Sequence, residues 1–220
     1  MRSSRNAFIF DLDGVIVDTA KYHYLAWKKL ADRLGIFFDE TENEKFKGVS
    51  RQKSLELLLQ SGGDSASESD FNQWMYEKNE DYLNLIQDMT EDEILIDVKK
   101  VLDYLKVRDQ GIALGSASKN ATLILDRVGL TAYFEVIIDG NKVTKAKPDP
   151  EVFIQAASGL NVSPIHTAVF EDAIAGVEAA NRAGMYSIGV GDTETLRHAK
   201  HLVEDFTELT LPFLDQLIDR

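Results

Sequence analysis

The sequence of 220 residues contains no cysteine and no long apolar run. The missing cysteine excludes disulfides, thiol nucleophiles and zinc sites built on thiolates. This composition fits a reducing compartment, so we expect a cytoplasmic protein. The apolar run in the N-terminal segment MRSSRNAFIFDLDG is interrupted by Asp11, and no other stretch approaches the ~18 apolar residues of a membrane span. We therefore expect no membrane partner.

Positive charge is also scarce. The sequence has 24 lysines and arginines but 37 aspartates and glutamates, which gives a formal net charge of −13. Nucleic-acid binding depends on basic side chains that neutralise phosphates, so we expect no nucleic-acid partner. The same negative field repels a small anionic substrate. A phosphate ester would need a local metal ion and a few well-placed cations.

The order of the predicted elements indicates an α/β protein with an inserted helical segment. A short strand, NAFIF, precedes a stretch from about 22 to 88 in which only helices are predicted; one of them ends at Gly35. Strands and helices then alternate, which predicts a parallel sheet with helices on both faces, a Rossmann-like three-layer core. One of the later helices is predicted to have Asp149 as N-cap and Pro150 as its first residue. We predict core segments at 1–18 and 91–220 and an all-helical cap domain at 19–90.

Polar side chains follow four of the predicted strands. Ligands of an open parallel sheet bind beyond the carboxyl ends of its strands, so these residues are expected to share one edge. They are Asp11 and Asp13, Ser116 and Ser118, Lys147, and the pair Glu171 and Asp172.

Carboxylates at one edge are the oxygen ligands that Mg²⁺ uses together with phosphate and water. We expect Asp11, Glu171 and Asp172, with Asp13 beside them, to form a metal site. Asp11 is then a candidate nucleophile toward phosphorus, and Asp13 a candidate for proton transfer. Ser116 and Lys147 are suited to hold the phosphoryl oxygens and neutralise their charge. Each residue alone has a simpler structural explanation; their joint placement favours an active site.

The motifs DLDG, SAS, KAKPDP and FEDA occur in this order across the whole chain. In this respect the chain resembles the haloacid dehalogenase superfamily, and its helical insertion resembles the cap of the sugar phosphomutases in that superfamily. The resemblance implies Mg²⁺ as cofactor and sugar phosphates and bisphosphates as ligands. We also expect a monomer.

The resemblance further implies a reaction. β-D-Glucose 1-phosphate would be interconverted with glucose 6-phosphate through an aspartyl-phosphate enzyme and β-glucose 1,6-bisphosphate. One alternative is a capped Mg²⁺-dependent sugar-phosphate phosphatase of the same superfamily. Another is a catalytically silent protein that binds sugar phosphates.

The resemblance also assigns residues in the cap, each with a plainer alternative. Lys78 lies on a mainly apolar helical stripe and could simply extend to solvent along it. Arg51 can bind a phosphate bidentately, or can be a surface residue at a helix start. His23 can be a hinge residue that assists Asp13, or a buried histidine. The complete implied set of substrate-binding residues is Thr19, His23, Trp27, Gly48, Val49, Ser50, Arg51, Ser54, Lys78, Ala117, Ser118, Lys119 and Asn120.

The sequence departs from the family pattern in two places. Ala173 follows the acid pair where relatives often have a hydroxyl residue, so one hydrogen bond near the site is in doubt. The segment LIDV stands where many relatives have a proline-glycine turn. The return from the cap to the core is therefore expected to have a different shape.

Overall fold

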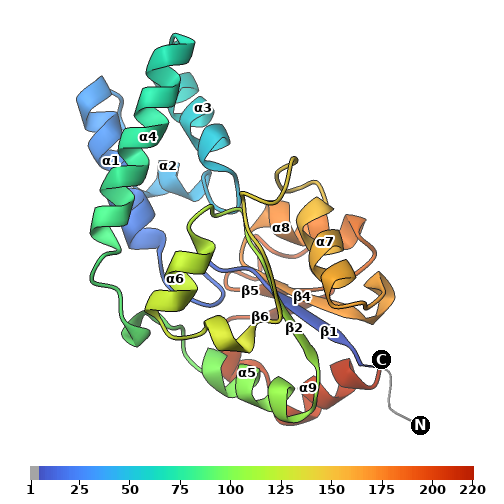
Figure 1. Cartoon of the computed structure of the whole chain (residues 1–220). Coiled ribbons are helices and arrows are strands. Elements are labelled where there is room, and N and C mark those ends of the chain that lie inside the picture. Colours follow the sequence, from blue (N-terminus) through green and yellow to red (C-terminus); the bar gives the residue numbers. More distant parts are fainter. Residues whose placement is uncertain (1–4) are drawn as a thin grey trace.

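A computed structural model describes residues 5–220 of the chain. Its core is a six-stranded parallel sheet in the order β3-β2-β1-β4-β5-β6, with helices on both faces (Figure 1). The α/β fold class is therefore confirmed. The strands are β1 (Ala7–Phe10), β2 (Gly111–Gly115), β3 (Val136–Ile138), β4 (Thr167–Glu171), β5 (Tyr186–Val190) and β6 (His201–Val203).

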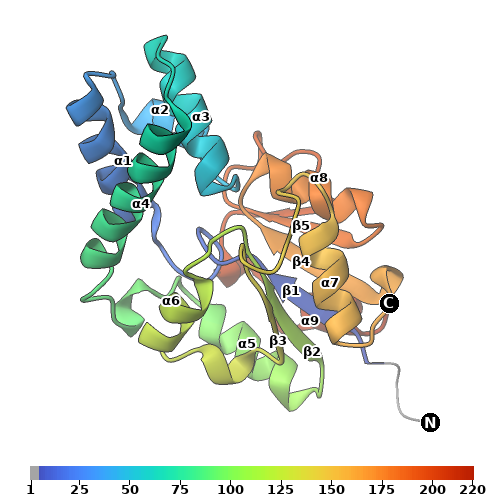
Figure 2. The ribbon, with the colours of Figure 1, turned by 45° about the horizontal axis from the view of Figure 1, so that its top comes forward.

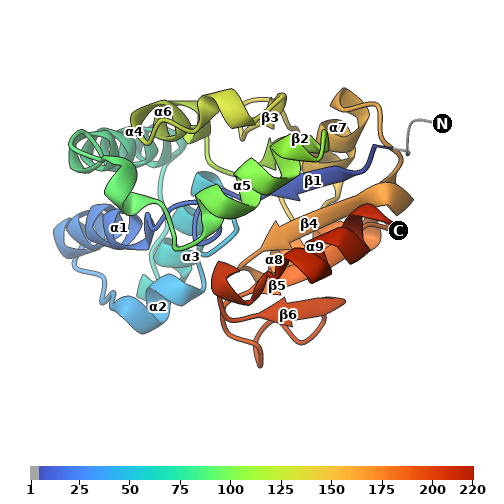
Figure 3. The same ribbon diagram turned by 90° about the horizontal axis from the view of Figure 1, so that it is seen from below.

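The central strand β1 is buried on both faces because its side chains alternate between two cores. Phe8 and Phe10 pack in the core beneath α5, α6 and α9, whereas Ala7 and Ile9 pack against α7 and α8. Figure 3 shows α5 and α9 lying across one face of the sheet. The core helices are α5 (Val98–Val107), α6 (Ala121–Arg127), α7 (Glu151–Gly159), α8 (Ile174–Arg182) and α9 (Leu211–Ile218).

The helices of the predicted cap lie together beyond the carboxyl ends of the strands (Figures 1 and 2). They have an apolar cluster of their own, which includes Trp27, Leu30, Phe38 and Leu55. Gly35 ends the first of these helices in a left-handed conformation, as predicted. The domain boundaries 19–90 stay a prediction, and residues 1–4 of the first core segment lie outside the described residues. The helices are α1 (Ala20–Leu34), α2 (Glu40–Glu44), α3 (Arg51–Gly62) and α4 (Glu68–Leu85).

The two linkers between the cap helices and the core run side by side. Val17 and Ile94 form an isolated antiparallel bridge, and the Asp18 N–H donates to the Glu93 carbonyl at 3.0 Å. The Glu93 carboxylate also accepts from Lys21 Nζ at 2.9 Å and from the Tyr22 hydroxyl at 2.6 Å. Both ends of α1–α4 are therefore attached at one place.

Two local expectations can be compared with the structure. The predicted helix start at Pro150 is wrong by one residue, because Pro150 is the N-cap and α7 begins at Glu151. Asp149 still caps the turn, since its Oδ1 accepts from the Glu151 N–H at 3.0 Å. At the LIDV segment, Asp97 adopts the left-handed φ of 59° that a glycine would favour. The turn therefore forms without the proline-glycine pair.

None of the helices among residues 5–220 is both long and apolar enough to cross a bilayer.

Candidate active site

Core packing brings the first acid and the late acid pair together. Phe10 of β1 is in register with Phe170 of β4, and their rings stack at 4.6 Å with an interplanar angle of 2°. Such a pair contributes about 0.5–1.5 kcal/mol beyond its buried area. The residues that follow, Asp11 and Glu171, therefore leave adjacent strands at the same edge.

Lys147 lies between these two carboxylates. It is buried and forms ion pairs with both Asp11 and Glu171, which are buried as well. Burial alone would lower the pKa of Lys147, but the two carboxylates raise it well above its ordinary value. The lysine is therefore held as a cation beside the nucleophile candidate, as an electrophilic group near phosphorus must be.

Asp13 and Asp172 form no ion pair within residues 5–220. Burial, and then the charges of Glu171 and Asp11, raise the pKa of Asp172 well above its usual range, and Asp13 adds to the effect. Lys147 thus pairs with two of four neighbouring carboxylates, and the oxygen donors of this group suit a hard divalent cation such as Mg²⁺. As the side chains stand, no three acidic, histidine or cysteine residues within 5–220 converge closely enough to hold a metal ion. The metal assignment of Asp11, Asp13, Glu171 and Asp172 stays a prediction.

Asp13 has a different environment from Asp11. It is half-buried and accepts a hydrogen bond from the Thr19 hydroxyl, which lies at the start of α1. Burial and the nearby charge of Asp11 raise the pKa of Asp13 to about 6, against the opposing effect of Thr19. A carboxyl group that titrates near 6 can both accept and donate a proton near neutral pH.

Lys78, the predicted cap lysine, is buried instead of extending to solvent. Its Nζ lies 3.0 Å from His23 Nδ1, 4.8 Å from the centre of the Trp27 ring and 4.7 Å from that of Tyr82. Burial and Arg51 lower the pKa of Lys78 to about 7, while Asp13 acts in the opposite direction. Burial, followed by Lys78 and Arg51, also lowers the pKa of His23 well below its usual value. His23, Arg51 and Lys78 therefore form a group of potential cations that faces Asp13.

The start of α3 presents Arg51 to this group. Ser50 is the N-cap, with its hydroxyl accepting from the Lys53 N–H at 3.3 Å, and the Ser54 hydroxyl donates to the Ser50 carbonyl at 3.2 Å. Both serines are thus used in holding the helix start, to which Gly48 and Val49 lead. In the described part of the chain, the Arg51 guanidinium has no hydrogen bond or ion pair. Its donors are free for an anionic ligand.

The predicted phosphate-binding residues after β2 form a tight loop. The Ser118 N–H donates to Ser116 Oγ at 3.1 Å, and the Asn120 N–H donates to Ser118 Oγ at 3.3 Å. Ala117 and Lys119 lie between them, and the Lys119 carbonyl accepts from Asn141 Nδ2 at 3.0 Å. We call residues 116–120 the serine loop. Ser116 is buried at its base, next to β1.

Besides the linkers and the apolar packing of Ala26 and Tyr82 on the core, two contacts near the site join the cap to the core. A Cβ built on Gly48 would lie 2.5 Å from Ala173 Cβ, so the loop before α3 touches the start of α8. Asn120 Nδ2 donates to Asn79 Oδ1 of α4 at 3.0 Å. The structure therefore places the cap against the core.

Sequence reasoning missed two residues of this region. Asn79 follows Lys78 directly, but a polar residue on a helix surface gives no signal of its own. Gly176 lies in α8, where a Cβ would come within 1.9 Å of the Glu171 carboxyl carbon. A glycine inside a predicted helix, shortly after an acid pair, is the signal that could have found it.

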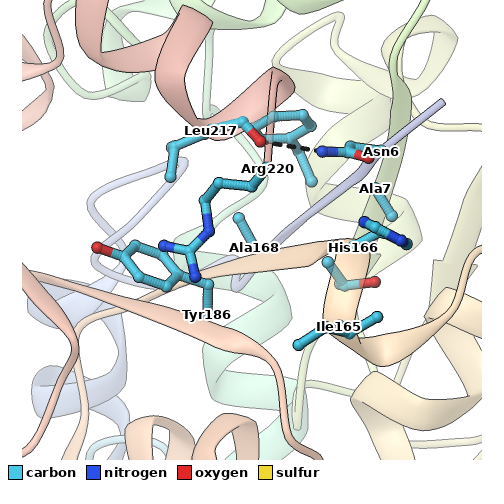
Figure 4. Close-up of a pocket in the computed structure, with 10 residues that line it drawn as sticks. Asn6, Ala7, Ile165, His166, Ala168, Tyr186, Leu217 and Arg220 are labelled. Atoms are coloured by element: carbon cyan, nitrogen blue, oxygen red, sulfur yellow. Dashed lines mark hydrogen bonds between the residues drawn. The ribbon is translucent and has the colours of Figure 1, made fainter. Parts of the chain in front are cut away.

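A small hollow lies at the opposite, amino end of the sheet. Figure 4 shows Asn6, His166, Tyr186 and Arg220 around it. Its cavity of about 10 Å³ has room for roughly one water molecule and no sugar phosphate. The edge with the acids is therefore the candidate active site.

The comparisons with known proteins agree with this geometry. Residues 6–184 match the model of the haloacid dehalogenase-like hydrolase family. The chain belongs to this family.

Within the family, the chain is similar to a β-phosphoglucomutase of Bacillus subtilis, with 42% identity over 96% of this chain and 94% of that protein. A crystal structure of a β-phosphoglucomutase from Clostridium difficile is 42% identical, with a TM-score of 0.94 over 98% of this chain and 97% of that one. A phosphorylated carbohydrates phosphatase of Thermotoga maritima is more distant, with 31% identity over 90% of each chain.

Proposed function

We propose that this chain is a β-phosphoglucomutase, an isomerase that interconverts β-D-glucose 1-phosphate and glucose 6-phosphate. The 42% identity to such an enzyme over nearly the full length of both chains is the observation on which the proposal rests. The candidate site supports it, because Asp11, Asp13, Ser116, Lys147, Glu171 and Asp172 are all present at one edge of the sheet.

The proposed cycle starts with Asp11 phosphorylated. Asp13 takes the proton of the sugar 6-hydroxyl as that oxygen attacks phosphorus, and the bond to Asp11 breaks to give β-glucose 1,6-bisphosphate. The bisphosphate then turns round. Asp11 attacks the 1-phosphate, Asp13 returns its proton to the departing O1, and glucose 6-phosphate leaves with Asp11 phosphorylated again. Lys147 neutralises charge on the transferred group throughout.

We propose that Asp11, Asp13, Glu171 and Asp172 hold Mg²⁺, which would neutralise phosphoryl oxygens when bound. The family supports this cofactor, and the excess of carboxylates at the site supports it independently. Arg51 and Lys78 are proposed to bind the phosphate that is not being transferred. The cap, proposed to span 19–90, would then exclude water from the aspartyl-phosphate.

A phosphatase on the same fold is the second candidate, favoured by the similarity to the Thermotoga maritima enzyme. The product decides between the two. We would incubate the chain with β-glucose 1-phosphate, Mg²⁺ and a trace of bisphosphate and follow phosphorus by NMR. Glucose 6-phosphate is the expected product; stoichiometric inorganic phosphate without it would contradict the proposal. Asp11→Asn should remove both products and serves as the control.

The other expectations stay predictions: a monomer, a cytoplasmic location, and no nucleic-acid or membrane partner. A sugar phosphate or bisphosphate is the proposed ligand, and the α-anomer of glucose 1-phosphate in the same NMR assay would measure anomer preference.

A further inference from the structure

Asn79 lies on the cap at the point where α4 meets the serine loop. The three ribbon views all place α6, which begins directly after Asn120, beside α4 (Figures 1, 2 and 3). Asn79 and Asn120 are both half-buried, and their side chains are joined by the 3.0 Å hydrogen bond from Asn120 Nδ2 to Asn79 Oδ1. A side-chain contact thus links the cap directly to a loop of the active site.

Apart from the bond to Asn79, the hydrogen bonds given above for the serine loop are made within the loop or to other parts of the core. Ser116 and Ser118 accept from N–H groups within the loop, the Gly140 N–H donates to the Ser118 carbonyl at 3.2 Å, and Asn141 holds the Lys119 carbonyl. These bonds belong to the core and do not depend on the position of the cap. The Asn120 side chain differs, because its hydrogen bond is to Asn79 of α4.

Asn79 also moves together with Lys78, which is proposed to bind the phosphate that is not being transferred. It is the residue after Lys78, whose side chain is anchored by His23, Trp27 and Tyr82. Because α4 is a continuous helix, a movement that brings Lys78 to the site also brings Asn79 to Asn120.

We propose that Asn79 is a positioning residue that orients Asn120 when the cap closes, and so completes the serine loop only in the closed state. This inference rests on the proposed function and deepens it. The bond stabilises the closed form by roughly the net value of one hydrogen bond, and its loss leaves a half-buried amide without a partner. Transfer to the sugar then competes less well with transfer to water, because a less stable closed form excludes water less completely.

The test is a double-mutant cycle with Asn79→Ala, Asn120→Ala and the double variant, assayed by phosphorus NMR with β-glucose 1-phosphate and Mg²⁺. We expect each single variant to lower kcat/KM about fivefold to tenfold, and the double variant to be no worse than the poorer single one. The ratio of inorganic phosphate to glucose 6-phosphate should rise in all three. Asn79→Asp keeps the acceptor oxygen and should restore most of the activity. Asn72→Ala, at an exposed position of the same helix, is the matched control.

Phosphorylation of Asp11 by acetyl phosphate, followed by intact-protein mass, separates this role from a folding defect. This small donor does not need the cap to close over a sugar, so the rate of phosphorylation in Asn79→Ala should stay within about twofold of wild type. Wild-type kcat/KM and product ratio in Asn79→Ala, or single effects that simply multiply in the double variant, would overturn the inference. If the wild-type chain makes phosphate and no glucose 6-phosphate, the proposed function fails, while coupling between Asn79 and Asn120 can still be measured on the phosphatase rate.

Discussion

At the scale of single residues, Asp11 and Asp13 show how two positions of one motif acquire different chemistry. Asp11 continues the ladder of β1, since its N–H donates to the Phe170 carbonyl at 3.0 Å, and its carboxylate pairs with Lys147. Asp13 lies past the strand and interacts with Thr19 at the start of the cap. Asp11 is therefore fixed against a lysine in the core, whereas Asp13, with a pKa of about 6, can exchange a proton near neutral pH.

The pKa of Asp13 predicts the acid limb of the pH profile. Transfer from phosphorylated Asp11 to the sugar hydroxyl needs ionised Asp13, so kcat/KM should fall about tenfold per pH unit below about 6. Thr19→Val removes the hydrogen bond that lowers this pKa, and the limb should move to higher pH. Initial rates of the wild-type and Thr19→Val chains from pH 5 to 8 would measure this shift.

If the acid limb has the same midpoint in Thr19→Val, Asp13 is not the group that titrates. Asp13→Asn should lose most of the activity and the acid limb with it.

Lys78 is expected to reduce the stability of the fold in which it functions. Its pKa is about 7 in the folded chain and near 10.5 in the unfolded one, so between these values the unfolded chain binds more protons and stability rises with pH. Lys78→Met should therefore raise the free energy of unfolding by about 1–4 kcal/mol at pH 6, with the gain shrinking toward pH 10. Urea unfolding at both pH values measures this.

The control for that experiment is Lys99→Met, which replaces an exposed lysine of α5. It should change stability little at either pH. A destabilising effect of Lys78→Met at pH 6 would mean that the contacts of Lys78 with Trp27 and Tyr82 outweigh its burial cost.

At this scale the sequence could predict types of residue but not their partners. Asp11, Asp13 and Lys147 were found because each follows a predicted strand. That Lys147 would bridge Asp11 and Glu171 could not be predicted, because it depends on the path of the loop before α7. Asn79 could not be found at all, since its partner lies 41 residues away on another element.

At the scale of elements, the start of α3 and the start of α8 approach so closely that side-chain size matters. Gly48 has a φ of 70°, and a Cβ there would lie 2.5 Å from Ala173. The missing hydroxyl at position 173 is thus accompanied by close contact with the cap. A hydroxyl residue at position 173 would add an atom at this crowded point.

Gly48→Ala should hold the cap away from the core. A non-glycine residue at positive φ costs about 1–2 kcal/mol, and the clash adds to it, so kcat/KM should fall at least about tenfold. Gly63→Ala is the matched control, since Gly63 also has a φ of 70° but has no atom within 4 Å of a built Cβ. Equal losses in both variants would mean that backbone strain, and not contact with Ala173, limits the reaction.

The elements themselves were largely predictable. Strand and helix periodicity predicted the alternation after residue 98 and the helical insertion before it, because each pattern reflects burial on one or two faces. The order of the strands in the sheet could not be predicted from the sequence, because it depends on how the connections between strands pack. The predicted start of α7 differs by one residue, because Pro150 is the N-cap and the Asp149 side chain accepts from the N–H of Glu151, the first residue of the helix.

At the scale of the whole molecule, the net charge of −13 is concentrated locally in four neighbouring carboxylates, two of which pair with Lys147. We expect Mg²⁺ to relieve their repulsion and stabilise the fold. At about 100 times its Kd the ion would add about 2.7 kcal/mol, which corresponds to a Tm rise of roughly 5–10 °C. Differential scanning fluorimetry with Mg²⁺ and with EDTA measures it. Asp172→Asn should reduce the shift, and no shift in the wild-type chain would argue against a metal at this site.

The paired linkers have a consequence for protein engineering. Because Val17 and Ile94 are bridge partners, the chain leaves the core and returns to it at almost the same point. A short turn from Val17 to Ile94 would close the core without threading the chain elsewhere. The helices between them could then be transplanted from a relative as one cassette, with Glu93 and its partners Lys21 and Tyr22 kept at the junction. Sugar recognition and phosphoryl chemistry would become separately exchangeable parts.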